Sequence, residues 1–311
     1  MLKDIDLKDI YLGKEYSLLT GVPGTNDPIP APEHAFDELA DIRMICDKAK
    51  ESTSKEEFAI RHNDVAYRVS ILESLSDTVY VLRRFPKTVP SLDILNIHQG
   101  YVEMLMRPRL SGLIVVSGAY GQGKTTTASS IIASRLNKYG GVGITIEDPP
   151  EMPLEGRHGD GQCYQTWVAQ GGFGDACRKA ARWAPSIIFL GEVRDQETAA
   201  EALRASINGR LVICTTHADS VPMAIERIYS LAKGDNGSSE DNSSLLASGL
   251  LCVVHQRLEN DPKTPKIEFL WLGSDEAQGV RSNIRSRRWD QIASEVKLQL
   301  NNMFLSRKVE A

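Results

Sequence analysis

The chain has 311 residues and a formal net charge of -5, with 25% charged and 6% aromatic residues. This length allows two domains with cores of their own, and the ordinary composition indicates a globular protein. The acidic balance disfavours a protein that binds nucleic acid through bulk positive charge, so no direct nucleic-acid partner is expected.

The five cysteines are scattered without a Cys-x-x-Cys pair, which excludes both a disulfide framework and a zinc site as the simple interpretation. The first residues, Met1-Leu-Lys-Asp-Ile-Asp, lack the apolar core of a signal peptide. No apolar stretch approaches the roughly 18 residues that a transmembrane helix needs. We therefore expect a cytoplasmic protein without a transmembrane segment.

Residues 1–90 are expected to form a first α+β domain. Residues 7–12 are compatible with a short strand, and residues 33–51 carry apolar side chains at helical spacing. Two strands of an antiparallel sheet are predicted over residues 58–72 and 78–85.

Residues 91–105 are interpreted as a linker with a lead-in helix that extends over 94–106, and residues 106–311 as the second domain. In this domain strands and helices alternate, which is typical of a doubly wound sheet. The predicted strands are residues 113–117, 143–147, 187–191 and 211–215. The polar segment 233–244 predicts a mobile surface loop. After it we expect a helix over 245–257, a strand over 267–272 and an amphipathic helix over 289–304.

A phosphate-binding loop is the central motif of the second domain. The pattern Gly-x-x-x-x-Gly-Lys-Thr follows an apolar strand and precedes a helix-compatible segment, as a P-loop requires. Its backbone N–H groups and the helix N-terminus would hold phosphates, Lys124 would reach the terminal phosphates, and Thr125 could ligate Mg²⁺. The candidate nucleotide-binding residues are Gly118, Ala119, Tyr120, Gly121, Gln122, Gly123, Lys124, Thr125 and Thr126.

Three further strands end in polar residues. The first delivers Glu147 in Thr-Ile-Glu-Asp-Pro-Pro-Glu, the second Glu192 in Gly-Glu-Val-Arg-Asp, and the third His217 in Thr-Thr-His-Ala-Asp. Ligands of open α/β sheets bind beyond the carboxyl ends of the strands, so these side chains should gather near the P-loop.

With these four motifs in this order, the chain resembles the PilT-like traffic ATPases of type II secretion, type IV pili and type IV secretion. The matching segments are GAYGQGKTT, TIEDPPE, GEVRD and TTHAD. The resemblance implies a RecA-like P-loop domain preceded by a small, PAS-like α+β domain. It also implies an ATP- and Mg-dependent hydrolase that forms a homo-oligomeric ring, expected to be a hexamer, and acts on an inner-membrane platform or secretion complex.

The chain departs from the family at two places. Arg210 stands where the family has its first box histidine, which leaves that residue's role open. The P-loop carries Ala119, Tyr120 and Gln122 where Pro, Thr and Ser are usual, although these are variable positions of the motif.

Roles at the site are assigned as hypotheses. ATP hydrolysis needs held phosphates, Mg²⁺ and a carboxylate that orients the attacking water. The sequence leaves open which of Glu147 and Glu192 orients the water; we favour Glu147 for the water and Glu192 for the metal side. His217 is a candidate sensor of the γ-phosphate.

Arginines outside the P-loop domain complete the candidate catalytic set. In the family the first domain contributes arginines toward a nucleotide, and the matching residues here are Arg68 and Arg83. Each could equally be a solvated charge on a strand. Arg194 is expected to be structural and paired with Asp195 or Asp148.

Other functions are possible on the same motifs. One is a nucleotide-binding ring scaffold or regulator with negligible turnover, and another is a DNA-translocating P-loop ATPase. A GTPase is disfavoured, because the Asn137-Lys138 pair ends in Gly140 and lies directly after the P-loop. Within the traffic ATPases, a role in type IV pilus dynamics or in type II or type IV secretion, including conjugative systems, is favoured.

Overall fold

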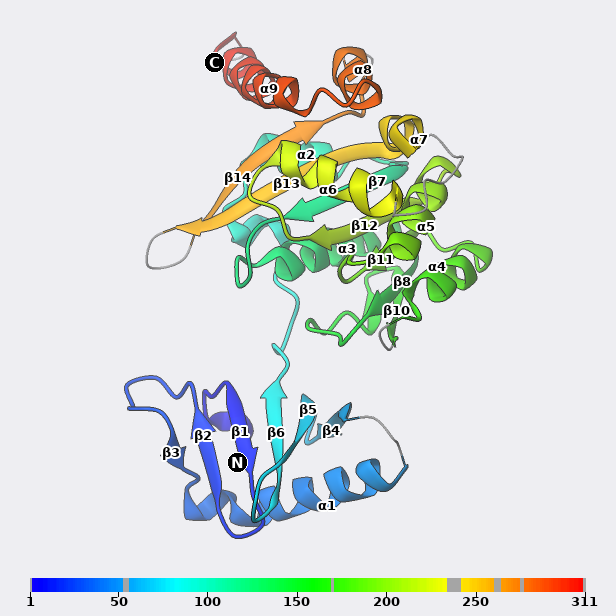
Figure 1. Cartoon of the computed structure of the whole chain (residues 1–311). Coiled ribbons are helices and arrows are strands. Elements are labelled where there is room, and N and C mark those ends of the chain that lie inside the picture. Colours follow the sequence, from blue (N-terminus) through cyan, green and yellow to red (C-terminus); the bar gives the residue numbers. More distant parts are fainter. Residues whose placement is uncertain are drawn as a thin grey trace. The chain divides into compact units, whose positions relative to one another are not determined.

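The structure is a computed structural model that describes residues 2–52, 56–168, 171–233, 242–259, 264–274 and 277–309, with side chains up to residue 302. The chain divides into two compact units, Met1–Lys87 and Thr88–Ala311 (Figure 1). Among the described residues, the helices are all too short or too polar to span a bilayer.

The first unit is built on an antiparallel sheet whose described strands follow the order β3-β2-β1-β6-β5-β4. The strands are β1 (Asp9–Leu12), β2 (Ser17–Thr20), β3 (Ile29–Pro30), β4 (Glu57–His62), β5 (Val65–Glu73) and β6 (Thr78–Arg84). A 3-10 turn, η2 (Glu33–Ala35), leads into α1 (Phe36–Ser52), which buries Leu39, Ile42 and Cys46 against the sheet. The expected strand near the start, the helix after residue 33 and the α+β class are confirmed.

The prediction of one strand over residues 58–72 was wrong, because this segment is a hairpin of β4 and β5. Its turn is made by Asn63 and Asp64, whose φ angles are 47° and 63°. Both residues therefore adopt the left-handed region that a two-residue type I′ hairpin turn needs, and Asn and Asp tolerate this region well. Arg68 and Arg83 lie directly opposite each other on β5 and β6.

The second unit contains a mixed sheet whose described strands follow the order β14-β13-β7-β12-β11-β8-β10-β9. The strands are β7 (Gly112–Ser117), β8 (Gly141–Glu147), β9 (Gly156–His158), β10 (Gly161–Trp167), β11 (Ile187–Leu190), β12 (Leu211–Thr216), β13 (Leu250–Glu259) and β14 (Thr264–Trp271). The strands from β13 to β10 run parallel to one another, whereas β14 and β9 pair antiparallel at the two edges. The four strands predicted around the motifs are confirmed.

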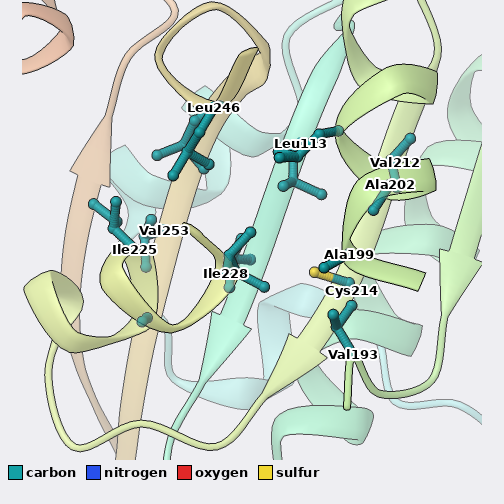
Figure 2. Close-up of a cluster of buried hydrophobic side chains, with 14 of the residues drawn as sticks. Leu113, Val193, Ala199, Ala202, Val212, Cys214, Ile225, Ile228, Leu246 and Val253 are labelled. Atoms are coloured by element: carbon teal, nitrogen blue, oxygen red, sulfur yellow. The ribbon is translucent and has the colours of Figure 1, made fainter. Parts of the chain in front are cut away.

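Helices cover both faces of this sheet, because successive strand residues point to opposite sides. On β7, Leu113 and Val115 belong to one core cluster, and Ile114 and Val116 to the other. The first cluster packs against α4 (Phe173–Arg182), α5 (Gln196–Ile207), α6 (Val221–Lys233), α7 (Asn242–Gly249), α8 (Gln278–Arg285) and α9 (Trp289–Val309). The second packs against α2 (Gln99–Leu105) and α3 (Lys124–Tyr139). Figure 2 shows strand residues such as Leu113 and Val253 meeting helix residues such as Ala202 and Ile228. A sheet packed on both faces confirms the doubly wound α/β fold.

The C-terminal part differs from the expectation at one element. The predicted helix over 245–257 is instead the end of α7 followed by β13, with the change at Gly249. A Cβ at Gly249 would lie 2.3 Å from Ser206 Oγ, so a larger residue there would force the Ser206 side chain to move where α7 approaches α5. Most of the polar segment 233–244 lies outside the described residues, while its last residues, from Asn242 on, begin α7. The strand near 267–272 and the C-terminal helix are confirmed.

The lead-in helix expected over 94–106 is interrupted. A 3-10 turn, η3 (Leu92–Leu95), comes first, and α2 begins only at Gln99. Asn96 between them has φ 53°, which ends the first turn. His98 then caps α2, since its Nδ1 accepts a hydrogen bond of 3.2 Å from Gly100 N.

Candidate functional site

The four sequence motifs meet at one edge of the parallel sheet. The strands β7, β12, β11 and β8 are consecutive neighbours and run in the same direction. Their carboxyl ends therefore lie side by side and lead, in this order, to the P-loop, His217, Glu192 and Glu147.

The P-loop joins β7 to α3 through a backbone that only glycine allows at its start. Gly118 has φ +153°, and a Cβ there would lie 2.4 Å from the carbonyl oxygen of Gln256 on β13. Lys124 is the first residue of α3, so the loop ends at a helix N-terminus whose N–H groups are available to an anion. This geometry fits the predicted phosphate-binding role of the loop.

The loop is fastened to β13 by the side chain of Gln122. Leu258 N donates to Gln122 Oε1 at 2.6 Å, and Gln256 Nε2 donates to the carbonyl oxygen of Gln122. Gln256 is 1% exposed, and its Oε1 has no hydrogen-bond partner among the described residues. Gln122, which stands where the family usually has Ser, thus joins the P-loop to the neighbouring strand β13.

Lys124 is largely buried at the start of α3. Its Nζ donates to Ala119 O at 2.8 Å and lies 3.4 Å from His217 Nδ1. Burial lowers the pKa of Lys124 below its ordinary value, while the carboxylates of Glu192 and Glu151 act in the opposite direction. The ammonium group is therefore held at the loop by a backbone carbonyl and an imidazole, with two carboxylates nearby.

His217 connects the lysine to Glu192. Its Nε2 lies 3.3 Å from Glu192 Oε1, and Arg194 donates to Glu192 Oε2 at 2.6 Å. The expected pairing of Arg194 with Asp195 or Asp148 was wrong: Asp195 instead caps α5 by accepting from Thr198 N, and Asp148 accepts from Trp167 Nε1 at 3.0 Å. Lys124, His217, Glu192 and Arg194 thus form a continuous chain of polar contacts.

Glu147 is the most buried acid of the edge, at 1% exposure. Gln165 Nε2 donates to its Oε1 at 2.8 Å, and Gly191 leaves room for its side chain, because a Cβ there would lie 3.1 Å from Glu147 Cγ. Burial raises the pKa of Glu147 to about 7, and the hydrogen bonds from Gln165 and Thr145 oppose that rise. A carboxyl group with this pKa can exchange a proton near neutral pH.

The remaining candidates of the loop take different places. Thr125 and Thr126 are half-buried in the first turn of α3, where Thr126 Oγ1 lies 3.9 Å from Met152 Sδ. Tyr120 is 84% exposed at the tip of the loop.

Arg68 and Arg83 belong to the other unit, where each is paired with a carboxylate of its own sheet. Arg68 NH2 donates to both oxygens of Glu57, at 3.0 and 2.9 Å. Arg83 Nε donates to Asp9 Oδ1 at 2.7 Å, and the arginine side chain is 51% exposed.

Sequence reasoning missed Gln165, since it lies on β10, an element that the sequence analysis did not predict. The signal for β10 is the short run Gly161-Gln-Cys-Tyr-Gln-Thr-Trp after a Gly-Asp-Gly turn, which is compatible with a strand. Gln256 lies on β13, and its contact with the P-loop becomes visible only in the fold.

The comparisons with known proteins agree on one family. The family model described as "Type II/IV secretion system protein" matches residues 40–291. The chain is 33% identical over 205 residues to the putative type II secretion system protein E of Escherichia coli (strain K12), covering 64% of this chain and 39% of that protein. It is 33% identical over 198 residues to the type IV pilus assembly ATPase TfpB of Acinetobacter baylyi, covering 61% and 31%. The chain thus spans less than two fifths of the length of these two curated relatives.

Two solved structures have a similar fold over most of this chain. The pilus retraction motor PilT with bound ADP is 26% identical, with a TM-score of 0.75, and the alignment covers 95% of this chain and 87% of that one. The ATPase DotB of Legionella pneumophila is 21% identical, with a TM-score of 0.71 and coverage of 94% and 85%. The latter likeness supports the RecA-like fold alone.

Proposed function

The chain belongs to the type II/IV secretion system protein family, and on that premise we propose that it is a ring-forming ATPase. It couples ATP hydrolysis to type IV pilus dynamics or to type II or type IV secretion, including conjugative systems. The relatives described as secretion ATPases, a pilus assembly ATPase and an ADP-bound pilus motor support this proposal.

The observation that carries the proposal is the edge of the parallel sheet. A P-loop lysine, a histidine and two glutamates lie at or just beyond the carboxyl ends of four neighbouring strands, and one of these glutamates has a pKa of about 7. Phosphoryl transfer to water requires held phosphates, neutralised charge and an oriented water, and these side chains supply groups for all three needs.

Burial and contacts support the following roles in the proposed reaction. The backbone of residues 118–123 and the N-terminus of α3 bind the phosphates, and Lys124 turns from Ala119 O toward the terminal phosphates. The carboxylate of Glu147 accepts a proton from the water whose oxygen attacks the γ-phosphorus, while the bond to the β,γ-bridging oxygen breaks and ADP leaves. His217, between Lys124 and Glu192, responds to the γ-phosphate.

The hydroxyl of Thr125 and the carboxylate of Glu192 are oxygen donors that fit Mg²⁺, which when bound supplies charge neutralisation at the phosphates. In the part of the chain that the structure describes, no group of three His, Cys, Asp or Glu side chains could hold a metal alone. This agrees with an ion that takes few protein ligands and completes its shell with phosphate oxygens and water.

Arg68 and Arg83 are proposed to act on a nucleotide within a ring. An arginine that meets transition-state charge raises the rate by about 10³ to 10⁵. In the first unit the two residues lie opposite each other on adjacent strands, where Arg68 pairs with Glu57 and Arg83 pairs with Asp9.

A hexameric ring is the proposed working particle. Its partner is an inner-membrane platform or secretion complex, against which the protein acts from the cytoplasm as a peripheral component. The family membership supports these assignments, and no direct nucleic-acid contact is part of them.

The test is steady-state ATP hydrolysis by the purified protein, with oligomeric state followed by light scattering with and without ATP. Wild type should turn over ATP and assemble, and Lys124→Ala should lose at least about 10²-fold in rate, because a buried cation at the phosphates is removed. Lys138→Ala, at the far end of α3, is the matched control and should behave like wild type. A Lys124→Ala variant with wild-type turnover, or an inactive monomer under all conditions, would overturn the proposal.

A further inference from the structure

The carboxylate of Glu147 is oriented by a side chain from the neighbouring strand. Gln165 on β10 pairs in register with Thr145 on β8, two residues before Glu147 and on the same face of the strand. From this position its amide reaches over Glu147, and Gln165 Nε2 lies 2.8 Å from Glu147 Oε1.

The orientation of the Gln165 amide is dictated by its other partners. Nε2 also donates to the carbonyl oxygen of Met152 at 2.8 Å, and Oε1 accepts from Glu155 N at 3.3 Å. Turning the amide over would place its oxygen against the carbonyl of Met152 and the carboxyl of Glu147, and its nitrogen against an N–H donor. Because a carbonyl oxygen only accepts hydrogen bonds, the amide must present an N–H to Glu147.

The backbone of Gln165 is fixed as well. Gln165 N donates to Glu155 Oε2 at 2.5 Å, so Gln165 and Glu155 exchange two hydrogen bonds across the segment that follows Glu147. Three further hydrogen bonds of Gln165, with Met152 and Glu155, therefore hold the amide that donates to the Glu147 carboxylate in one orientation.

We propose that Gln165 is a positioning residue for ATP hydrolysis, which fixes the rotation of the Glu147 carboxylate and stabilises its ionised form. This inference rests on the proposed function of the site. The amide N–H engages Oε1, so the rotation of the group is set before a water molecule binds. A side chain without a donor at position 165 would leave the carboxylate with less stabilisation and a less defined direction.

The other groups that face Glu147 do not replace this donor. The carboxylate of Glu151 repels it and raises its pKa. The Cys163 thiol on β10 is buried, with its pKa raised to about 12, and stays uncharged near neutral pH. Gly191, directly after β11, contributes no polar side-chain atom. Besides Gln165, the remaining stabilisation comes from Thr145 and the backbone at Glu151.

The decisive variant is Gln165→Met, which keeps the length of the side chain and removes the donor. Gln162→Met on the same strand is the matched control, because the Gln162 amide donates to Cys163 O and does not reach Glu147. Gln165→Glu keeps an acceptor for Glu155 N and adds a like charge, so it serves if Gln165→Met does not fold.

Two measurements separate this inference from the proposed function. The first is the ¹³C NMR titration of the Glu147 carboxyl carbon, identified by its loss in Glu147→Gln, which needs no turnover. Gln165→Met should raise the midpoint by about 1 to 2 pH units, as expected for the loss of a hydrogen bond to a charged group, and Gln165→Glu, which also adds a like charge, should raise it further. The second is the pH dependence of ATP turnover, whose acid limb should move by the same amount while KM for ATP stays near that of wild type.

The inference fails if the midpoint of Glu147 in Gln165→Met stays within about 0.3 pH units of that in Gln162→Met and wild type. It also fails if the midpoint moves but the acid limb of an active enzyme does not. If the midpoint moves and wild type hydrolyses no ATP, the contact is verified, and the proposed function is what fails.

Discussion

Two pairs of charged residues in this protein have different partners: Arg68 and Arg83 on the sheet of the first unit, and Lys124 and Glu147 at the edge of the parallel sheet. On the antiparallel sheet of the first unit, Arg68 and Arg83 each meet a carboxylate at 2.9 Å or less. At the edge of the parallel sheet, Lys124 is held by a backbone carbonyl and an imidazole, and Glu147 by an amide. An opposite charge stabilises the folded state, whereas a neutral partner leaves a buried charge costly and available for chemistry. This difference supports the proposal that Lys124 and Glu147 take part in the chemistry, whereas Glu192 at the same edge is paired with Arg194.

The largest expected effect is on ATP turnover, from the substitution of a paired arginine of the first unit. If Arg83 acts on a nucleotide in the ring, Arg83→Ala lowers ATP turnover by about 10³-fold or more, in spite of its ion pair. Asp9→Asn removes the same ion pair but keeps the guanidinium, so its turnover should stay near that of wild type. Steady-state ATP hydrolysis by both variants checks this.

For Arg68 the variant is Arg68→Ala, and its control is Glu57→Gln, which removes the ion pair but keeps the guanidinium. In Arg68→Ala and Glu57→Gln the free energy of unfolding should change by no more than about 1 kcal/mol, because the Arg68–Glu57 ion pair is partly exposed. Equal losses of turnover in Arg83→Ala and Asp9→Asn would show that the pair, and not the arginine, is what matters.

The next largest effect is on the pH dependence of stability, and it comes from Glu147. Its pKa is raised from 4.5 to about 7, so between these values the folded protein binds a proton that the unfolded chain has released. Stability therefore falls as pH rises through this window, and the full cost is present above pH 7. Glu147→Gln should raise the free energy of unfolding at pH 8 by about 3 kcal/mol, at about 1.4 kcal/mol per pKa unit, and change it little at pH 4.5.

Urea unfolding at both pH values measures this, with Glu226→Gln, an exposed glutamate of α6, as control. If Glu147→Gln is no more stable than wild type at pH 8, the contacts of the ionised Glu147 carboxylate offset the cost of its burial.

The smallest expected effect is the loss of stability when the hydrogen bond between the P-loop and β13 is removed. Gln122→Ala removes the acceptor of Leu258 N, and a backbone donor left without a partner costs about 1 to 2 kcal/mol of stability. Gln122→Glu keeps an oxygen at this place and should stay closer to wild type. If thermal unfolding gives the same stability for Gln122→Ala, Gln122→Glu and wild type, the side chain of Gln122 does not stabilise the loop.

The sequence indicated the parts of this arrangement that depend on local pattern. Apolar strands followed by polar residues located Lys124, Glu147, Glu192 and His217, because parallel strands bring their carboxyl ends to one edge. The pairing of Arg194 with Glu192 could not be read in the same way, since three acids lie within reach along the chain.

Errors arose where periodicity is ambiguous or where contacts are distant. The apolar run around Gly249 fits a helix and a strand equally well, and the Asn63-Asp64 turn lies inside an otherwise continuous strand pattern. Gln165 lies 18 residues from Glu147 on a strand that pairs with β8, so its contact with the carboxylate follows from sheet pairing and not from any motif.

The most direct test of the account is ATP turnover at pH 8 by wild type and Glu147→Gln, measured on protein whose stability is known. The account predicts that Glu147→Gln is at least as stable as wild type and hydrolyses ATP about 10² to 10⁴ times more slowly, the range typical of a lost general base. Equal turnover in the two proteins would contradict it and would remove Glu147 from the chemistry.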